Sequence, residues 1–334
     1  MAGGSTKAVY TAIVGNSMVM VAKFGAFAMT GSGAMLSEGI HSFADVGNQI
    51  LLAVGIKSSQ RDADEDHPYG YAREQFIWAM ISAVGIFFLG CGVTVYHGIH
   101  SLMHPEPLEQ MGVAAVVLVF SFIVEGGTLV VAARSVQQQA KESGMSFSRY
   151  VVEGPDPMGV AVLLEDGAAV IGVSMAGLAV ALIHFTGNPI WDGIASIAIG
   201  LLLGGIAIFL VYKNRAALLT PSISDDDRQK VLGVLRDDPV VETVKDVKAT
   251  VIGADSVRFK AEIEFDGRAI AHRHLEGRDL RADLARVQTE AELQQYLESF
   301  GDALVDALGD EIDRLEKRIQ AAVPRARHVD LEAD

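Results

Sequence analysis

The chain has 334 residues, of which 50% are hydrophobic, and a formal net charge of −15 at pH 7. This apolar content, gathered in long runs before residue 213, excludes an ordinary soluble domain for that part of the chain. Most acidic residues follow residue 220, and a strongly acidic chain is poorly suited to nucleic acid as a partner. Cys91 is the single cysteine, which excludes an internal disulfide and a cysteine-rich zinc site.

Six apolar segments are each long enough to cross the hydrocarbon layer, which takes about 20 helical residues. Because backbone groups within lipid have no water to bond, we expect all six to be helices. The predicted spans are residues 8–29, 34–56, 75–102, 111–133, 159–185 and 190–212. The first span is followed by no signal-peptide cleavage pattern, so we interpret it as retained.

Lysine and arginine residues alternate between the two sides of these spans. They occur before the first span, in the second and fourth connections and after the sixth span, whereas residues 30–32, 103–110 and 186–189 contain none. The positive-inside rule therefore predicts that both termini are cytoplasmic. A retained first span without an arginine-rich presequence favours a bacterial inner membrane as the location.

The residues after the last span are predicted to form a cytoplasmic α/β domain, so we divide the chain into a transport domain at 1–215 and a second domain at 221–334. The second domain has the order αββαβ, which is ferredoxin-like. Its predicted elements are a helix at 225–236, strands at 244–251 and 257–265, a long helix at 288–322 and a strand at 327–331. Residues 269–286 fit neither pattern.

Ionisable side chains within the second span point to function, because they are costly inside a membrane. His41 and Asp45 are one helical turn apart, and with Glu38 and Asn48 they fall within an arc of about 80° on an ideal helix. Such a polar stripe on an apolar helix is typical of half a metal site, with Glu38 and Asn48 as supporting or proton-carrying groups.

The fifth span carries a second acidic pair, Glu165 and Asp166. One imidazole nitrogen with carboxylate oxygens from two spans suits Zn²⁺ and also Mn²⁺, Fe²⁺ or Co²⁺. Without the ion the carboxylates favour protons, so metal and protons compete, which is the basis of an antiporter. The alternative is that these groups hydrogen-bond between helices or line a water-filled cavity.

The motifs resemble those of the cation diffusion facilitator family. The resemblance rests on residues 37–45 (SEGIHSFAD), on His67-Pro68-Tyr69-Gly70, on six spans and on an αββαβ tail. Within the family, residues 45–49 (DVGNQ) and 164–166 (LED) are most similar to the zinc transporter nine branch of the solute carrier 30 group. The resemblance implies zinc or a related ion bound between the second and fifth spans, proton exchange by alternating access, and a homodimer.

The family's ligand pattern maps onto His41, Asp45 and Asp166, but Val162 occupies the position of the fourth ligand. Glu165 is the natural substitute, although it lies about 100° from Asp166 on an ideal helix. Either the helix turns so that both carboxylates converge, or Glu165 accepts protons outside a site completed by water. Oxygen in place of nitrogen hardens the site and weakens the expectation of strict zinc selectivity.

A further family metal site, in the loop after the second span, maps onto Asp64 and His67. Tyr71 stands where another histidine is often found, so a solvated acidic patch that attracts cations is the favoured interpretation. The tail's histidines, without cysteine, match the family's tail zinc sites poorly, and the resemblance makes dimerisation its expected role.

Other polar residues leave two interpretations each. Glu125 in the fourth span is either a proton relay or an interhelical hydrogen-bonding group. Lys23 either extends to the membrane interface or pairs with a buried carboxylate. Three histidines lie near the outer end of the third span, namely His97, His100 and His104. They either contact the metal ion as it exits or are ordinary interfacial residues.

Together these features predict a proton-coupled efflux transporter for a divalent cation, with zinc as the favoured substrate, and not an enzyme with a prosthetic group. One alternative keeps this reaction with Mn²⁺, Fe²⁺, Co²⁺ or Ni²⁺ as substrate. Another is a membrane metal sensor that transports nothing. An intramembrane hydrolase is disfavoured because no nucleophile or HExxH motif accompanies the ligands.

Overall fold

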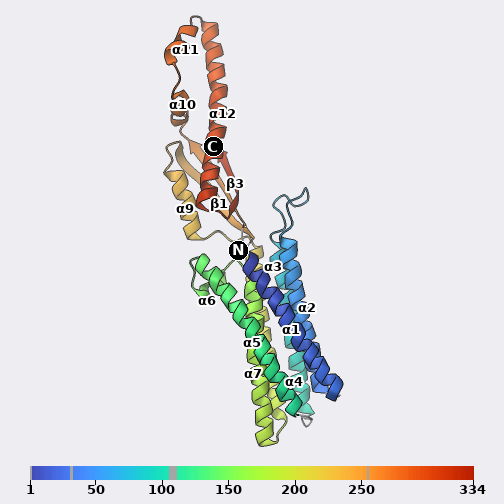
Figure 1. Cartoon of the computed structure of the whole chain (residues 1–334). Helices are drawn as coiled ribbons and strands as arrows, with labels where there is room; N and C mark the ends of the chain where they lie inside the picture. Colours follow the sequence, from blue (N-terminus) through green and yellow to red (C-terminus); the bar gives the residue numbers. More distant parts are fainter. Residues whose placement is uncertain (1, 31–32, 105–110, 254–255) are drawn as a thin grey trace. The chain divides into compact units, whose positions relative to one another are not determined.

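The structure, a computed structural model, describes residues 2–30, 33–104, 111–253 and 256–334 (Figure 1). It divides into two compact units, Met1–Leu219 and Thr220–Asp334. Each unit has a hydrophobic core of its own. The predicted class, a multi-pass helical membrane domain followed by an α/β domain, is confirmed.

The described part of the first unit contains nine helical segments, of which eight make six long passes and one, between the fourth and fifth passes, is short. The helices are α1 (Ala2–Thr30), α2 (Gly33–Ser59), α3 (Glu74–Gly85), η1 (Ile86–Val93), α4 (Thr94–Met103), α5 (Met111–Glu142), α6 (Phe147–Glu153), α7 (Pro157–Thr186) and α8 (Ile190–Leu218). The helices α3, η1 and α4 follow one another directly and together form the third pass. Within the described residues, five passes are long and apolar enough to cross a membrane. The pass formed by α2 is less apolar because it carries His41, Asp45, Asn48 and Gln49.

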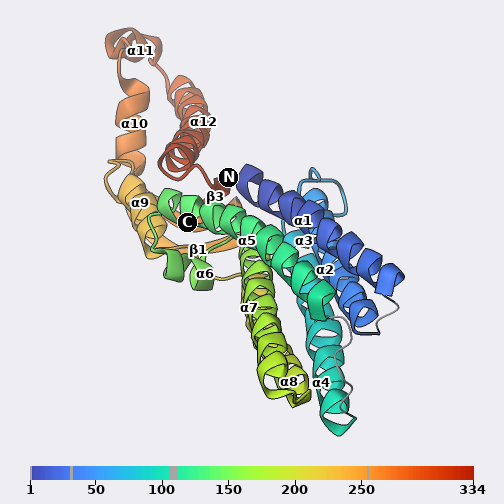
Figure 2. The same cartoon turned by 60° about the horizontal axis from the view of Figure 1, so that its bottom comes forward.

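Some helices of the bundle pack against the next helix in the chain, and others pack against helices that are far away in sequence. Both views show α1 running beside α2, and α5 and α7 also pack against α1 (Figures 1 and 2). A methyl group on Gly98 of α4 would lie 2.9 Å from the carbonyl oxygen of Gly193 on α8. Glycine is therefore required where these two helices touch.

Local sequence explains the ends of α7. Asp156 accepts hydrogen bonds from the backbone N–H groups of Met158 and Gly159, and Pro157 occupies the first helical position. Gly187 ends the helix with a left-handed φ of 67°. These signals position the fifth pass, which carries two of the candidate ligands.

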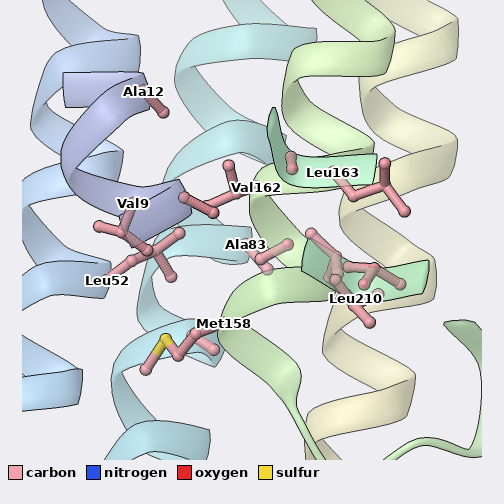
Figure 3. Close-up of a cluster of buried hydrophobic side chains, with 14 of the residues drawn as sticks. Val9, Ala12, Leu52, Ala83, Met158, Val162, Leu163 and Leu210 are labelled. Carbon is pink, nitrogen blue, oxygen red and sulfur yellow. The ribbon is translucent and has the colours of Figure 1, made fainter. Parts of the chain in front are cut away.

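The core of the membrane unit joins helices from all six passes. Val9, Leu52, Ala83, Met158 and Leu210, from α1, α2, α3, α7 and α8, are each at most 2% exposed (Figure 3). This apolar layer holds the two ligand-bearing helices, α2 and α7, in one bundle.

The second unit is a three-stranded mixed sheet with helices. Its elements are α9 (Asp225–Arg236), β1 (Val241–Gly253), β2 (Ser256–Phe265), α10 (Gly267–Leu275), α11 (Leu280–Arg286), α12 (Glu290–Ala322) and β3 (Ala326–Ala333). The strand order is β1-β2-β3, with β1 and β2 antiparallel and β2 and β3 parallel. The segment that fitted neither pattern forms α10 and α11, so two short helices interrupt the predicted αββαβ order. A capping box between Thr289 and Glu292 begins α12.

Candidate metal site

A single cavity in the membrane unit collects the ionisable residues singled out from α2 and α7. His41 and Asp45 line it from α2, and Glu165 and Asp166 line it from α7. Asn48 also lines it and is 6% exposed. Acidic groups more than 100 residues apart in the sequence thus line one space.

The polar contacts within the cavity are few. The Nε2 atom of His41 lies 3.7 Å from the Oδ2 atom of Asp45. Asp45, Glu165 and Asp166 all line this cavity, so three carboxylates share one space. Gathering like charges in an apolar bundle is unfavourable unless cations balance them, so the cavity is built for positive charge.

The two acidic residues of α7 have different surroundings. Glu165 accepts a hydrogen bond of 3.4 Å from the Ser82 hydroxyl of α3. Asp166 is 1% exposed, and its Oδ2 atom has no hydrogen-bond partner among the described residues. An unsatisfied carboxylate oxygen at this depth is costly, and a bound cation or proton would remove the cost.

Both side chains line the cavity although they are neighbours in sequence, because the lining residues of α7 cover a broad arc of the helix, about 160° from Ala168 to Asp166 on an ideal helix. In the described part of the chain, no three His, Cys, Asp or Glu side chains are close enough to hold one metal ion as they stand. Val162 is fully buried in the hydrophobic core and contributes no ligand.

Other predicted residues fall near the cavity or outside the described side chains. Glu125 of α5 lines the cavity and is 6% exposed. Glu38 belongs to α2, but its side chain lies outside the described residues. Lys23 is 3% exposed and lines the cavity, which corrects the interpretation that it extends to the membrane interface. Asn16 and Gln49 also line the cavity; both were missed because a single amide in an apolar segment has no distinctive pattern.

The third pass contains a π-helical segment, η1, that the sequence did not predict. Ile86 and Gly90 of this segment line the cavity. Segments of this type are frequent at functional sites because the wider turn changes which residues face inward. The apolar sequence of η1 shows no signal that would have identified it.

The loop after α2 holds Asp64 and His67 together through its own hydrogen bonds. Asp64 accepts one from the Tyr71 hydroxyl at 2.7 Å and one from the His67 backbone N–H at 2.8 Å. The Arg61 guanidinium lies 3.9 Å from the centre of the Tyr71 ring. No third metal ligand joins the pair among the residues that the structure describes. These contacts account for the loop's conformation without a metal ion.

Replacing Tyr71 by Phe is expected to raise the pKa of Asp64. The Tyr71 hydrogen bond holds that pKa below its ordinary value, assisted by the His67 backbone N–H. Because the pKa is lowered in the folded protein, this contact stabilises the loop above the ordinary pKa of Asp and is lost as pH falls through the lowered value. A ¹³C NMR titration of aspartate carboxyls measures the change, with Tyr69→Phe as the control. An unchanged Asp64 titration in Tyr71→Phe contradicts the expectation.

Three histidines, His97 and His100 of α4 and His104 directly after it, form no metal cluster among the described residues. The rings of His100 and His104 stack with centroids 4.9 Å apart, and both side chains are exposed. This arrangement agrees with the interpretation of these residues as interfacial.

A six-pass helical bundle with an acidic internal cavity defines a membrane protein that handles cations. The chain belongs to the cation diffusion facilitator, or cation efflux, family, because the family's transmembrane-domain model matches residues 9–219.

Comparison with known proteins extends the similarity to nearly the whole chain. The chain is 45% identical over 335 aligned residues to metal tolerance protein C4 of Arabidopsis thaliana, covering 98% of this chain and 73% of that protein. It is 43% identical to the mitochondrial proton-coupled zinc antiporter SLC30A9 of Homo sapiens, again over 98% of this chain but 58% of the human protein. A more distant relative is the cation-efflux pump FieF of Shewanella oneidensis, at 27% identity over 72% of this chain and 76% of the pump.

Proposed function

We propose that this protein exports a divalent metal ion, with zinc as the favoured substrate, in exchange for protons. The observation that carries the proposal is the shared cavity, in which His41 and Asp45 of α2 face the same space as Glu165 and Asp166 of α7. The name of the human relative, a proton-coupled zinc antiporter, supports the choice of ion and of exchange partner.

In the proposed cycle, the metal ion binds first to the carboxylates that already share the cavity. Asp45 and Asp166 supply two negative charges that neutralise a divalent ion, and His41 supplies a nitrogen ligand. Because the ligands are not gathered in this structure, we infer that they converge when the ion enters and separate when protons replace it. Glu165 contributes either a direct ligand or a proton acceptor, while Asn48 and Glu125 line the surrounding cavity.

The setting of this cycle is also part of the proposal. The basic connections support cytoplasmic termini, with export away from the cytoplasm across a membrane that we propose to be a bacterial inner membrane. A homodimer, implied by the family resemblance, remains a prediction about assembly.

Reconstituted vesicles test this function. Purified protein in liposomes that contain a zinc indicator and a pH indicator is expected to move Zn²⁺ with proton counterflow, and an imposed pH gradient is expected to drive the uptake. Competition by Mn²⁺, Fe²⁺, Co²⁺ and Ni²⁺ ranks the substrates. Metal binding without flux would instead support a sensor, and stronger transport of another ion would reassign the substrate.

A further inference from the structure

The cavity contains a positive charge that belongs to the protein. Lys23 of α1 is 3% exposed and is the single lysine or arginine that lines the described cavity. Four acidic residues line the same space, and these are Asp45, Glu125, Glu165 and Asp166. A buried ammonium within a cavity that receives cations is unexpected, because it repels any metal ion that enters.

The packing of α1 against α5 places Lys23 and Glu125 in the same region. A methyl group on Gly15 would overlap Thr128, whereas Ala26, further along α1, packs with Ala114 and Val117. The two helices are therefore antiparallel. In this register Lys23 lies at about the level of Leu118, another cavity residue.

The same geometry directs the two charged side chains toward each other. Glu125 lies about two helical turns beyond Leu118, toward the N-terminal half of α1. Every Cα–Cβ bond tilts toward the N-terminus of its own helix, so in antiparallel helices Lys23 and Glu125 lean toward a common level. Both residues have interaction partners in the structure. Glu125 is 6% exposed, so any charge it carries is also largely shielded from solvent.

On the basis of the proposed function, we propose that Lys23 is a resident counter-charge that weakens divalent-metal binding and keeps it reversible, with Glu125 as the group that holds the ammonium in place. A transporter must bind its ion strongly enough to capture it and weakly enough to release it. Four carboxylates around one divalent ion favour capture strongly, and one fixed ammonium moderates that attraction.

A purely structural ion pair is a weaker explanation of this placement. Buried ion pairs can often be replaced by apolar residues of similar volume with little loss of stability. A pair needed only to join α1 and α5 would also gain nothing from facing the cavity. The distinction is measurable, because a counter-charge changes metal affinity in a direction that depends on the sign of the charge removed.

Zinc binding to the purified full-length protein, measured by calorimetry, tests the proposal. Lys23→Met is expected to bind Zn²⁺ about tenfold more tightly, since it removes a positive charge from the cavity, and Glu125→Gln about tenfold more weakly. The Lys23→Met/Glu125→Gln protein is expected to lie between them, and Lys23→Arg to stay near wild type. In vesicles, Lys23→Met is expected to lower both the KM for zinc and the maximal rate.

Several outcomes would overturn the proposal. Zinc affinity in Lys23→Met that is unchanged or weaker, in protein with a wild-type melting temperature, shows that the ammonium does not oppose the metal. Should Lys23→Met fail to fold, the comparison of Glu125→Gln with the double variant decides, because adding Lys23→Met must tighten binding there too. If Asp45→Asn abolishes zinc binding but Lys23→Met leaves the zinc affinity unchanged, the counter-charge role of Lys23 is wrong while the proposed function stands. If the wild type binds no zinc, the proposed function fails with it.

Discussion

Replacing Asp166 by Asn is expected to abolish zinc transport and to weaken zinc binding by roughly 100-fold or more. The substitution keeps the size of the side chain but removes a negative charge and a proposed ligand oxygen from a position that is 1% exposed. Asp45→Asn is expected to act in the same way, because Asp45 lines the same cavity and is the second carboxylate of the proposed site. Zinc uptake by reconstituted vesicles and calorimetry on the same preparations measure the two effects.

Asp192 offers a matched control for this experiment. It is an acidic residue in the first turn of α8, where its carboxylate accepts a hydrogen bond of 3.3 Å from Ser101, and it does not line the described cavity. Asp192→Asn is therefore expected to keep zinc affinity within about twofold of wild type, as for substitutions away from a binding site. Wild-type transport by Asp166→Asn would remove the basis for a site shared between α2 and α7.

The sequence predicted best those structural features that depend on a single segment of the chain. Apolar length alone predicted the passes, and the four-residue spacing of His41 and Asp45 was enough to place both on one side of α2. Whether they share a cavity with Asp166 depends on packing between helices. The charge argument predicted this arrangement, and the cavity supports it. The resemblance to a known family implied the same pairing of these two spans.

Features that depend on tertiary structure were not predictable in the same way. Ideal-helix geometry separates Glu165 from Asp166, yet both line the cavity because its lining covers a broad arc of α7. The π-helical segment η1 has no composition signal, and α10 and α11 are too short to show a clear period. The inward position of Lys23 follows from its neighbours on α2, α5 and α7, whereas a lone lysine in an apolar segment more often indicates a side chain that extends to the interface.

Replacing Asp238 by Ala is expected to destabilise the α/β unit by about 2–3 kcal/mol, the range for charge-assisted hydrogen bonds. Asp238 is 4% exposed and lies between α9 and β1. Arg314 of α12 holds both carboxylate oxygens at 2.9 Å, and Arg318 makes a further ion pair with it. Removing the carboxylate leaves two guanidinium groups without this partner and loosens the attachment of α12.

The pH dependence of this unit follows from the same carboxylate. Burial raises the pKa of Asp238, but hydrogen bonds from Arg314 and from the Val240 backbone N–H, with the charge of Arg318, outweigh burial and lower the pKa overall. The stabilisation is therefore present above the ordinary pKa of Asp, about 4, and is lost as pH falls through the lowered value. Hydrogen exchange of α12 in the full-length protein, corrected for intrinsic rates, is expected to rise in wild type below about pH 4.

The control for the Asp238 experiment is Asp226, an exposed residue that pairs with Lys230 one turn along α9. Asp226→Ala is expected to change stability by less than about 0.5 kcal/mol, because exposed ion pairs contribute little. Exchange rates in α12 that are equal in Asp238→Ala and Asp226→Ala would show that the buried carboxylate does not anchor the helix. Faster exchange confined to Asp238→Ala would instead show that this one side chain couples α12 to the connection between α9 and β1.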